Sequence, residues 1–418
     1  MKTANETSLC FFEDRQSDFF KPLILTRPMD DLRVGIYTIR EKWLQALHTT
    51  SYQRKLRPEL RGIFDSPHES AATVLWINSR LLPDPCMISR IRSMTKGSMI
   101  SYNEVPLVLK TDRTTTERWL NQGISPNRFS TITLPESPLV LQQLWDLLTC
   151  NTGEIYRDIE RTSGLSTLDS GALPGVNVYG GHPVYCGKEV TIEPGVTFIT
   201  TSGPVFIGHG ARIMAGSLIR GAAAICDGST VRMGAKIYEN STIGPVCKVG
   251  GELNSVIFHS YSNKAHDGYA GNSIFGQWCN LGADTTTSNL KNNYKTVRFI
   301  DWHSRQERDT REQFLGTVMS DHSKTGINSM LTTGTNCGVC CNLFSDDYPP
   351  KLIPSFSWVN SDRIETYLFE KAVGTMERTM KRRNVVLTDA YVRLMRTLYE
   401  GRMAEAETGQ SVDGVRVA

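Results

Sequence analysis

The sequence predicts a parallel β-solenoid of six-residue repeats, with a mixed α/β domain before it and helices after it. Three observations support this fold class: an aliphatic residue recurs every six positions, glycine becomes abundant after Gly164, and helical spacing appears after Pro354. A helix has a period of 3.6 residues and a strand a period of two, so neither produces a spacing of six. The recurring residues are Ile207, Ile213, Ile219, Ile225, Val231, Ile237, Ile243 and Val249.

The first domain is expected over residues 9–165. Short apolar runs at 74–77 and 107–109 indicate strands. The spacing of apolar residues at 34–47 and 139–148 indicates helices. We therefore expect a mixed α/β domain here.

The solenoid is expected over residues 166–356, and its Ser/Gly/Pro-rich start at 166–182 is a linker or a loose first coil. Each repeat provides one short parallel strand, three repeats complete a triangular coil, and the aliphatic side chain points inward. The repeat is interrupted at 253–272 and at 289–313. We expect loops in both places, because loops on a rigid scaffold often carry binding and catalysis.

Helices are predicted for residues 357–402, where Ile364, Tyr367 and Leu368 have helical spacing. Such helices protect the open end of a solenoid. Residues 403–418 are polar and are expected to form a disordered tail.

The composition limits the class of function. The chain has 418 residues and a formal charge of +3, which argues against a nucleic-acid or membrane-surface protein that relies on bulk charge. No apolar leader and no run of membrane-spanning length is seen. The ten cysteines show no paired framework, which is typical of a reducing compartment. We expect a cytoplasmic protein that binds anions through local clusters of cations.

Cys337, Cys340 and Cys341 are spaced closely enough to raise the question of a metal site. The six-residue spacing, however, continues through Thr325, Leu331, Cys337 and Leu343. Cys337 is therefore interpreted as an inward-facing core residue rather than a metal ligand.

A candidate site lies in the interrupted repeats. His266 and Tyr269 occur in one stretch, and Asn280 and Asn289 follow it. If the coil closes between the stretches, the two amides lie beside the His266 loop. A neutral imidazole can take a proton from an attacking amine, and amides can hold an acyl oxygen or a substrate hydroxyl. The set suits acyl transfer to an amine, although a lone histidine is often an ordinary core or loop residue.

These segments resemble the acetyltransferase half of the bifunctional enzymes that make UDP-N-acetylglucosamine. The resemblance implies a left-handed parallel β-helix of hexapeptide repeats. It implies that His266 is the base that activates a sugar amine for attack on acetyl-CoA. It also implies that Tyr269 and Asn280 contact the sugar or its phosphate, and that Asn289 lies by the acetyl group.

One phosphate-binding arginine of that family carries over as well. Residues 231–235 match its Leu-Arg-Pro-Gly-Ala segment, so Arg232 takes the place of this arginine. The second phosphate-binding cation of the family does not carry over, because counting along the chain reaches Gly250 or Asn254. Lys248 or Lys264 could substitute for it.

Hexapeptide solenoids of this kind are usually trimers that bind acceptor and acetyl-CoA between subunits, so the resemblance implies a homotrimer. In that setting the C-terminal run of basic residues could bind the phosphates of coenzyme A. A solvated helix face is the alternative interpretation. The run consists of Arg378, Lys381, Arg382 and Arg383.

Near the N-terminus, Phe12–Arg15, Lys21–Pro28 and Asp31–Trp43 are similar to segments of sugar nucleotidyltransferases that are fused to a hexapeptide domain. This resemblance implies a Rossmann-like nucleotidyltransferase fold for the first domain. The sequence departs from the usual pattern, since residues 10–34 contain no glycine for a phosphate-binding loop. Residues 78–80, Asn-Ser-Arg, also lack the aspartate that usually holds Mg²⁺.

Nucleotide phosphates would then have to be bound by side chains, and Asp14 or Asp31 would be left for a Mg²⁺ ion. Ordinary surface positions are the alternative for these basic residues. The candidates are Arg15, Arg27, Arg33 and Lys42.

Taken together, these resemblances imply an acetyl-CoA-dependent N-acetyltransferase for an amino-sugar 1-phosphate, with glucosamine 1-phosphate as the expected acceptor. The linked domain is expected to transfer a nucleotide to a sugar 1-phosphate, giving UDP-N-acetylglucosamine or a similar product. The alternative is a regulatory or scaffold protein whose degenerate sites bind sugar nucleotides. The expected partners are small molecules and copies of the same chain, without nucleic acid or membrane.

Overall fold

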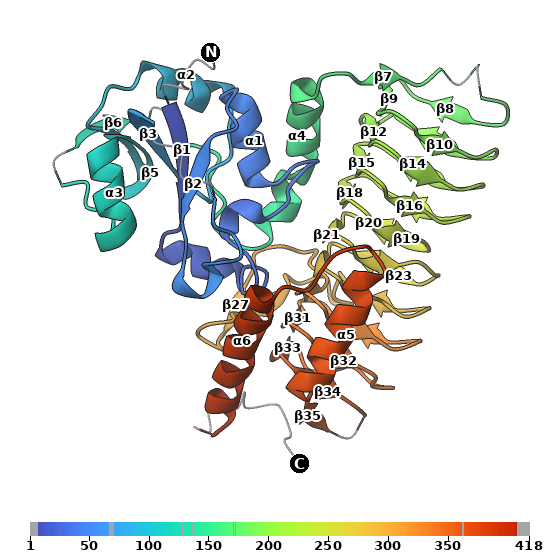
Figure 1. Cartoon of the computed structure of the whole chain (residues 1–418). Coiled ribbons are helices and arrows are strands. Elements are labelled where there is room, and N and C mark those ends of the chain that lie inside the picture. The colour runs from blue at the N-terminus through green and yellow to red at the C-terminus, as the bar shows by residue number, and fades with distance from the viewer. Residues whose placement is uncertain are drawn as a thin grey trace. The chain divides into compact units, whose positions relative to one another are not determined.

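The computed structural model describes residues 7–66, 71–127, 129–134, 137–169, 171, 173–361 and 363–407 (Figure 1). The chain divides into two compact units. The first consists of Met1–Phe20, Arg27–Leu32 and Tyr37–Leu144, and the second of Lys21–Thr26, Arg33–Ile36 and Trp145–Ala418. Two short segments from the N-terminal sequence therefore belong to the second unit.

The first unit is built on a six-stranded mixed sheet in the order β2-β1-β3-β5-β4-β6. Strand β1 is parallel to β2 and β3, β4 is parallel to β6, and β5 is antiparallel to β3 and β4. The predicted mixed α/β fold is confirmed. The strands are β1 Thr7–Phe12, β2 Tyr52–Lys55, β3 Thr73–Asn78, β4 Ser98–Tyr102, β5 Val105–Asp112 and β6 Ser130–Thr133. The helices are η1 Arg15–Phe20, η2 Met29–Asp31, η3 Pro58–Leu60, α1 Ile39–Ala46, α2 Pro85–Ser93 and α3 Arg113–Gln122.

Two predicted helices begin later in the structure than in the prediction, each for a different reason. Helix α1 starts only at Ile39, because Thr38 and Glu41 form a capping box there. The helix predicted from residue 139 instead begins at Asp146, in α4 Asp146–Arg161. Residues 139–141 are drawn into an antiparallel bridge with Leu81, and this tertiary pairing overrides their helical spacing.

The second unit is a parallel β-helix with three faces, and the predicted left-handed hexapeptide solenoid is confirmed. Its ten-stranded face contains β7 Ser166–Thr167, β9 Val184–Cys186, β12 Val205–Ile207, β15 Ala223–Ile225, β18 Ser241–Ile243, β21 Ile257–Ser260, β24 Ile274–Gln277, β28 Val318–Met319, β31 Asn336–Cys337 and β33 Leu352–Ile353. The eight-stranded face contains β8 Asn177–Tyr179, β11 Thr197–Ile199, β14 Leu218–Arg220, β17 Lys236–Ile237, β20 Glu252–Asn254, β23 Tyr269–Gly271, β25 Thr286–Thr287 and β30 Met330–Leu331.

The third face carries the candidate site. It begins with β10 Thr191–Ile192, β13 Arg212–Ile213, β16 Thr230–Val231, β19 Lys248–Val249 and β22 Asn263–Lys264. It continues through parallel bridges at Asn280 into β29 Lys324–Thr325, β32 Asn342–Leu343, β34 Ser357–Val359 and β35 Ile364–Thr366. The face is therefore one continuous ladder.

The inward side chains stack in register from coil to coil. On the ten-stranded face, Ile225 pairs with Ile243 and Phe258 with Phe275, and all four are buried. The two phenylalanine rings stack with their centroids 4.5 Å apart. Burying an aliphatic or aromatic side chain contributes about 2 kcal/mol, so each residue of this column stabilises the solenoid. Cys337 lies in the same column, as predicted, paired with Met319 and Ile353.

The two predicted interruptions differ in structure. Strands β20 to β23 continue the coil through 252–271, so His266 lies in a corner between β22 and β23 and not in the expected extruded loop. The second interruption does leave the coil, and its β26 Arg298–Ile300 and β27 Glu307–Asp309 form an antiparallel hairpin.

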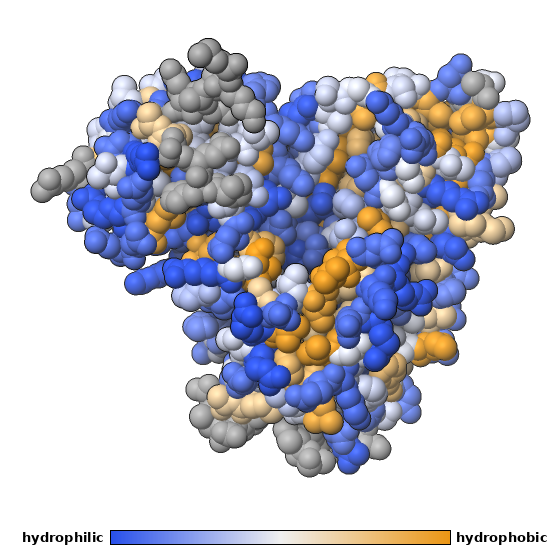
Figure 2. Space-filling model, in the orientation of Figure 1, coloured by the Kyte–Doolittle hydropathy of each residue, from blue (hydrophilic) through white to orange (hydrophobic). Residues whose placement is uncertain are grey.

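Helices complete the second unit. α4 contacts β15 and β18. α5 Phe369–Lys381 and α6 Asp389–Glu407 pack with Phe356 and Cys340 in one apolar cluster. Figure 2 shows apolar surface along the line where α5 and α6 lie in Figure 1. Of the predicted tail, residues 408–418 lie outside the described residues, and 403–407 continue α6. Within the described ranges, no helix has both the length and the apolar character required to cross a membrane.

Candidate active site

A cleft of about 510 Å³ lies between the third face of the solenoid and the residues that end α5. Lys248, Asn263, Asn280 and Lys324 line it from the strands of this face and are called the floor residues, and His266 lines it as well. Tyr261 and Trp278 form an aromatic wall, with ring centroids 4.3 Å apart. Thr379, Arg382 and Arg383 line it from the C-terminal segment.

The floor residues form one row because the strands are parallel and in register. Lys248 is paired with Asn263, Asn263 bridges to Asn280, and Asn280 bridges to Lys324. Neighbouring strands lie about 4.8 Å apart, so each side chain has the next one within reach. Two amides are thus placed between two lysines.

His266 is exposed in the corner after β22, and Lys264 secures the backbone of this corner. Lys264 takes the inward position that Val249 occupies on the preceding coil, and it is fully buried. Its Nζ donates hydrogen bonds to the carbonyl oxygens of His266 at 3.0 Å and Asp267 at 2.9 Å. Burial lowers the pKa of Lys264 to about 8. This ammonium group is buried and donates to the main chain, so Lys264 is not a candidate phosphate ligand.

Tyr269 and Asn289 lie together, but outside the cleft. Tyr269 is half-buried on β23, and burial raises its pKa in spite of a hydrogen bond from Asn289. The Nδ2 of Asn289 also donates to the Oδ1 of Asn272 at 2.7 Å. Within one chain, the structure therefore brings His266 together with Asn280, and Tyr269 together with Asn289, as two separate groups.

Arg232 is exposed on the same corner column of the solenoid as His266. Gly250 lies on the coil between them: a Cβ there would be 3.3 Å from the Cβ of Arg232 and 2.9 Å from the carbonyl oxygen of Ala265. The corner has no room for a side chain at this position. The close packing around Gly250 thus excludes a cationic side chain at this position.

The C-terminal basic run is split by the structure. Arg382 and Arg383 line the cleft, whereas Arg378 and Lys381 are exposed elsewhere. The Nη2 of Arg383 donates to the Oδ1 of Asn263 at 3.0 Å. The charge of Arg383, followed by burial and the charges of Arg232 and Arg382, lowers the pKa of Lys248.

In the first unit, Asp14 is held by Arg80 and Asn78. The guanidinium donates from Nε to Oδ1 at 3.0 Å and from Nη2 to Oδ2 at 2.6 Å, and Asn78 donates to Oδ2 at 2.8 Å. The remaining Nη1 of Arg80 donates to the carbonyl of Leu141. Burial alone raises the pKa of Asp14, but the hydrogen bonds and charge of Arg80 leave it below the usual value.

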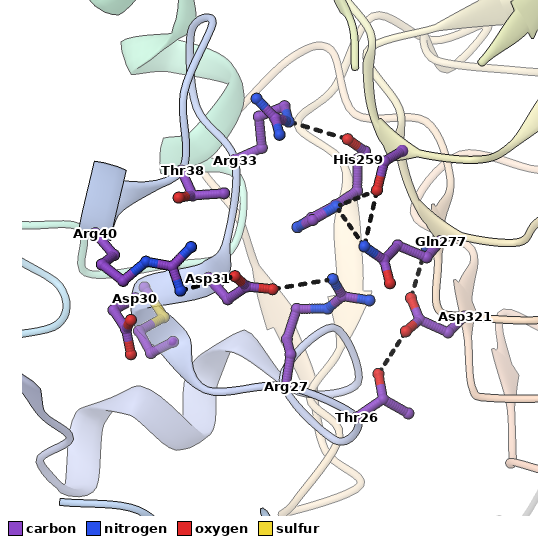
Figure 3. A network of polar contacts seen from close by, with 12 residues as sticks. Thr26, Arg27, Asp30, Asp31, Arg33, Thr38, Arg40, His259, Gln277 and Asp321 are labelled. Carbon is purple, nitrogen blue, oxygen red and sulfur yellow. Dashed lines mark hydrogen bonds and ion pairs between the residues drawn. The ribbon is translucent and has the colours of Figure 1, made fainter. Parts of the chain in front are cut away.

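The other nucleotide-binding candidates are placed differently from one another. Arg27 is buried, with its Nη1 3.5 Å from Asp31, and Arg40 approaches the other oxygen of Asp31 at 3.7 Å (Figure 3). Lys42 is fully buried on α1, whereas Arg15 is exposed at the start of η1. Arg27 and Lys42 are thus buried side chains, whereas Arg15 is open to solvent.

Arg33, the last of the candidates, belongs to the second unit. Its Nε donates to the carbonyl of His259 at 2.9 Å, and its Nη1 to the carbonyl of Ile36. Nearby, Gln277 donates from Nε2 to Ser260 and from its backbone to Asp321, which accepts from Thr26 at 2.6 Å (Figure 3). This network was not predicted, because its residues come from distant segments and carry no shared spacing.

Mg²⁺ does not fit these carboxylates as they stand. Both oxygens of Asp14 accept hydrogen bonds from Arg80 or Asn78, and those of Asp31 face Arg27 and Arg40. Across the described part of the chain, no group of three or more His, Cys, Asp or Glu side chains could hold a metal ion.

Comparison with known proteins shows what the first part of the chain is similar to. Residues 9–165 match the family described as sugar nucleotidyl transferase. The chain is also 33% identical over 90 residues to the bifunctional protein GlmU of Methanocaldococcus jannaschii. The predicted resemblance to a nucleotidyltransferase fused to a hexapeptide acyltransferase is confirmed.

These likenesses have a limited extent. The aligned residues are 22% of this chain and 21% of the Methanocaldococcus protein. The UDP-N-acetylglucosamine acyltransferase of Campylobacter jejuni aligns with a TM-score of 0.27 and 12% identity, over 53% of this chain and 94% of that one. The Arabidopsis enzyme aligns with a TM-score of 0.20 and 14% identity, over 58% and 92%.

We expect Arg80→Met to destabilise the first unit by about 3 kcal/mol near neutral pH, because it leaves the Asp14 carboxylate without its cation. The pKa of Asp14 is lowered in the folded protein, so the ion pair stabilises the fold at pH values above the usual carboxyl pKa. This stabilisation is lost as the pH falls through the folded-state pKa of Asp14. Urea unfolding should therefore show the difference from wild type shrinking in acid. Arg113→Met is the control, since its pair with Glu117 is exposed. Equal losses in both variants would contradict the assignment.

For Lys264→Met we expect stability to differ from wild type in a pH-dependent way. The pKa of Lys264 is about 8 in the folded protein against a usual 10.5, so the unfolded chain binds more protons between these values. The unfolding free energy of the wild type should accordingly rise, relative to the variant, from about pH 8 to about pH 10. The exposed Lys236→Met is the control. If the difference in unfolding free energy between wild type and Lys264→Met did not depend on pH, this would argue against a buried ammonium.

Proposed function

We propose that the protein is an acetyl-CoA-dependent N-acetyltransferase that acts on an amino-sugar 1-phosphate, with glucosamine 1-phosphate as the first candidate. The observation that carries the proposal is the exposed imidazole of His266 at the edge of a cleft that contains amides and cations. The match to a bifunctional GlmU protein supports the same reaction class.

In the proposed reaction, His266 accepts a proton from the amine of the acceptor, and the amine nitrogen attacks the thioester carbonyl. The carbon–sulfur bond breaks and coenzyme A leaves as a thiolate that takes up a proton. Asn280 supplies an amide donor for the acyl oxygen, where negative charge develops in the tetrahedral intermediate.

We further infer that the active form is a homotrimer. Tyr269 and Asn289 lie outside the His266 cleft of their own chain, on the eight-stranded face of the solenoid. A site assembled between neighbouring chains supplies both groups at once, whereas one chain does not. In this trimer, Tyr269 contacts the acceptor and Asn289 contacts the acetyl group in the site formed with a neighbouring chain.

For residues 9–165 we infer a nucleotidyltransferase-like domain without turnover. The family match supports binding of a sugar nucleotide. The ion pairs Asp14–Arg80 and Arg27–Asp31 support the loss of catalysis, since these charges are already balanced within the chain. Nucleotidyl transfer to N-acetylglucosamine 1-phosphate, giving UDP-N-acetylglucosamine, is the competing function.

His266→Ala is expected to abolish acetyl transfer and leave the fold intact, because the side chain is exposed in a corner and absent from the inward column. Removal of a general base typically lowers the rate by about 10²–10⁴-fold. Thiol release from acetyl-CoA with glucosamine 1-phosphate measures the reaction. His303→Ala, another exposed histidine, is the control. Undiminished activity in His266→Ala would remove it as the base.

No pyrophosphate is expected when the wild-type protein is incubated with UTP, N-acetylglucosamine 1-phosphate and Mg²⁺. The reason is that Asp14 and Arg80, which follow β1 and β3, bind each other. A coupled phosphate assay after pyrophosphatase treatment measures the product. Steady pyrophosphate release would establish nucleotidyl transfer and overturn the inference of a silent domain.

A further inference from the structure

One end of the cleft is strongly basic. Lys248 on β19 faces Arg382 and Arg383, which follow α5, and all three line the cleft. Arg232 stands close enough for its charge to act on Lys248, together with those of the two C-terminal arginines. Four cations thus come from three separate parts of the chain.

Within the described residues, these cations have no acidic partner. Among the described residues that line the cleft, none is Asp or Glu. Over the same described part of the chain, Lys248, Arg232, Arg382 and Arg383 form no ion pair, whereas Arg54 is paired with Asp30 and Arg80 with Asp14. Like charges held together without a counter-charge repel one another, and a bound anion removes that repulsion.

The geometry suits a phosphate. Arg383 is half-buried, and its hydrogen bond to Asn263 fixes the guanidinium beside the strand that pairs with Lys248. A guanidinium presents five donors in a planar fork, and one of them is used here, so others stay available to phosphate oxygens. Lys248 adds an exposed ammonium from the neighbouring coil.

We propose that Lys248 and Arg383, assisted by Arg382, form a phosphate-binding site at the basic end of the His266 cleft. The packed corner at Gly250 has no room for a second phosphate-binding cation. In the proposed site, β19 and the C-terminal segment supply that cation instead. Its role in acyl transfer rests on the proposed function. The ligand is a phosphate monoester or diphosphate, carried either by the acceptor sugar or by coenzyme A.

The test is calorimetric binding of two probes, glucosamine 1-phosphate and coenzyme A, to the full chain at low ionic strength. The variants are Arg383→Gln and Lys248→Met, with Arg393→Gln as control. Arg393 is also an exposed arginine of the C-terminal helices, on α6 and outside the cleft. The substituted side chains are exposed or half-buried, and melting temperatures verify that each variant folds.

We expect at least one probe to bind the wild type and to bind Arg383→Gln and Lys248→Met about tenfold or more weakly, with Arg393→Gln unchanged. A loss confined to glucosamine 1-phosphate assigns the acceptor phosphate, and a loss confined to coenzyme A assigns the donor. Wild-type affinity in both cleft variants, or no binding of either probe, overturns the site. Failure of the proposed function looks different, because binding then persists and depends on Arg383 while no thiol is released from acetyl-CoA.

Discussion

The in-register stacking of parallel strands is the constraint on which the rest of the second unit depends. Backbone hydrogen bonds place each coil directly over the next, about 4.8 Å away, so a residue's neighbours are set by its position in the coil. Inward positions then form apolar columns, and outward positions form rows. Lys248, Asn263, Asn280 and Lys324 share one row for this reason alone, although they are far apart in sequence.

Lys264 shows what happens where this constraint and the site compete. Its position is an inward one, filled by Val249 on the coil before, and an ammonium there is costly because burial disfavours charge. In return, two main-chain carbonyls of the His266 corner have a fixed donor. Departures from local rules of this kind are expected at functional sites, and this one lies directly beside the proposed base.

The sequence could predict the regular part of the solenoid because one register runs unbroken from Ile207 to Val249. It could not predict that the coil continues afterwards. Leu253 and Phe258, both inward, follow their predecessors by fewer than six residues, and Lys264 then replaces an aliphatic residue. The shorter corners and the polar inward residue make the six-residue period unrecognisable in the sequence, although the ladder of backbone hydrogen bonds continues.

The candidate site was predictable to a similar degree. The sequence predicts Asn280 and Asn289 beside the His266 loop; in the structure His266 and Asn280 line one cleft, and Asn289 is not among the residues that line it. The contact between Arg383 and Asn263 joins residues 120 positions apart and depends on where α5 ends, which no spacing encodes. In the first unit, the Asp14–Arg80 pair follows from the adjacency of β1 and β3, again a property of strand order rather than of sequence.

The state of its arginines is the clearest difference between the two parts of the chain. Arg80 already donates to a carboxylate and to a carbonyl, and its charge is balanced by Asp14, so it attracts a phosphate less strongly than an unpaired arginine does. An arginine such as Arg383, oriented by an amide and facing other cations, gains by binding the same anion. The fold that residues 9–165 share with sugar nucleotidyltransferases therefore does not by itself locate phosphate chemistry there, because function resides in sites and not in folds. By the same physical criterion, the cleft beside His266 is the more favourable setting for a bound anion, because its cations lack an acidic partner among the described residues that line it.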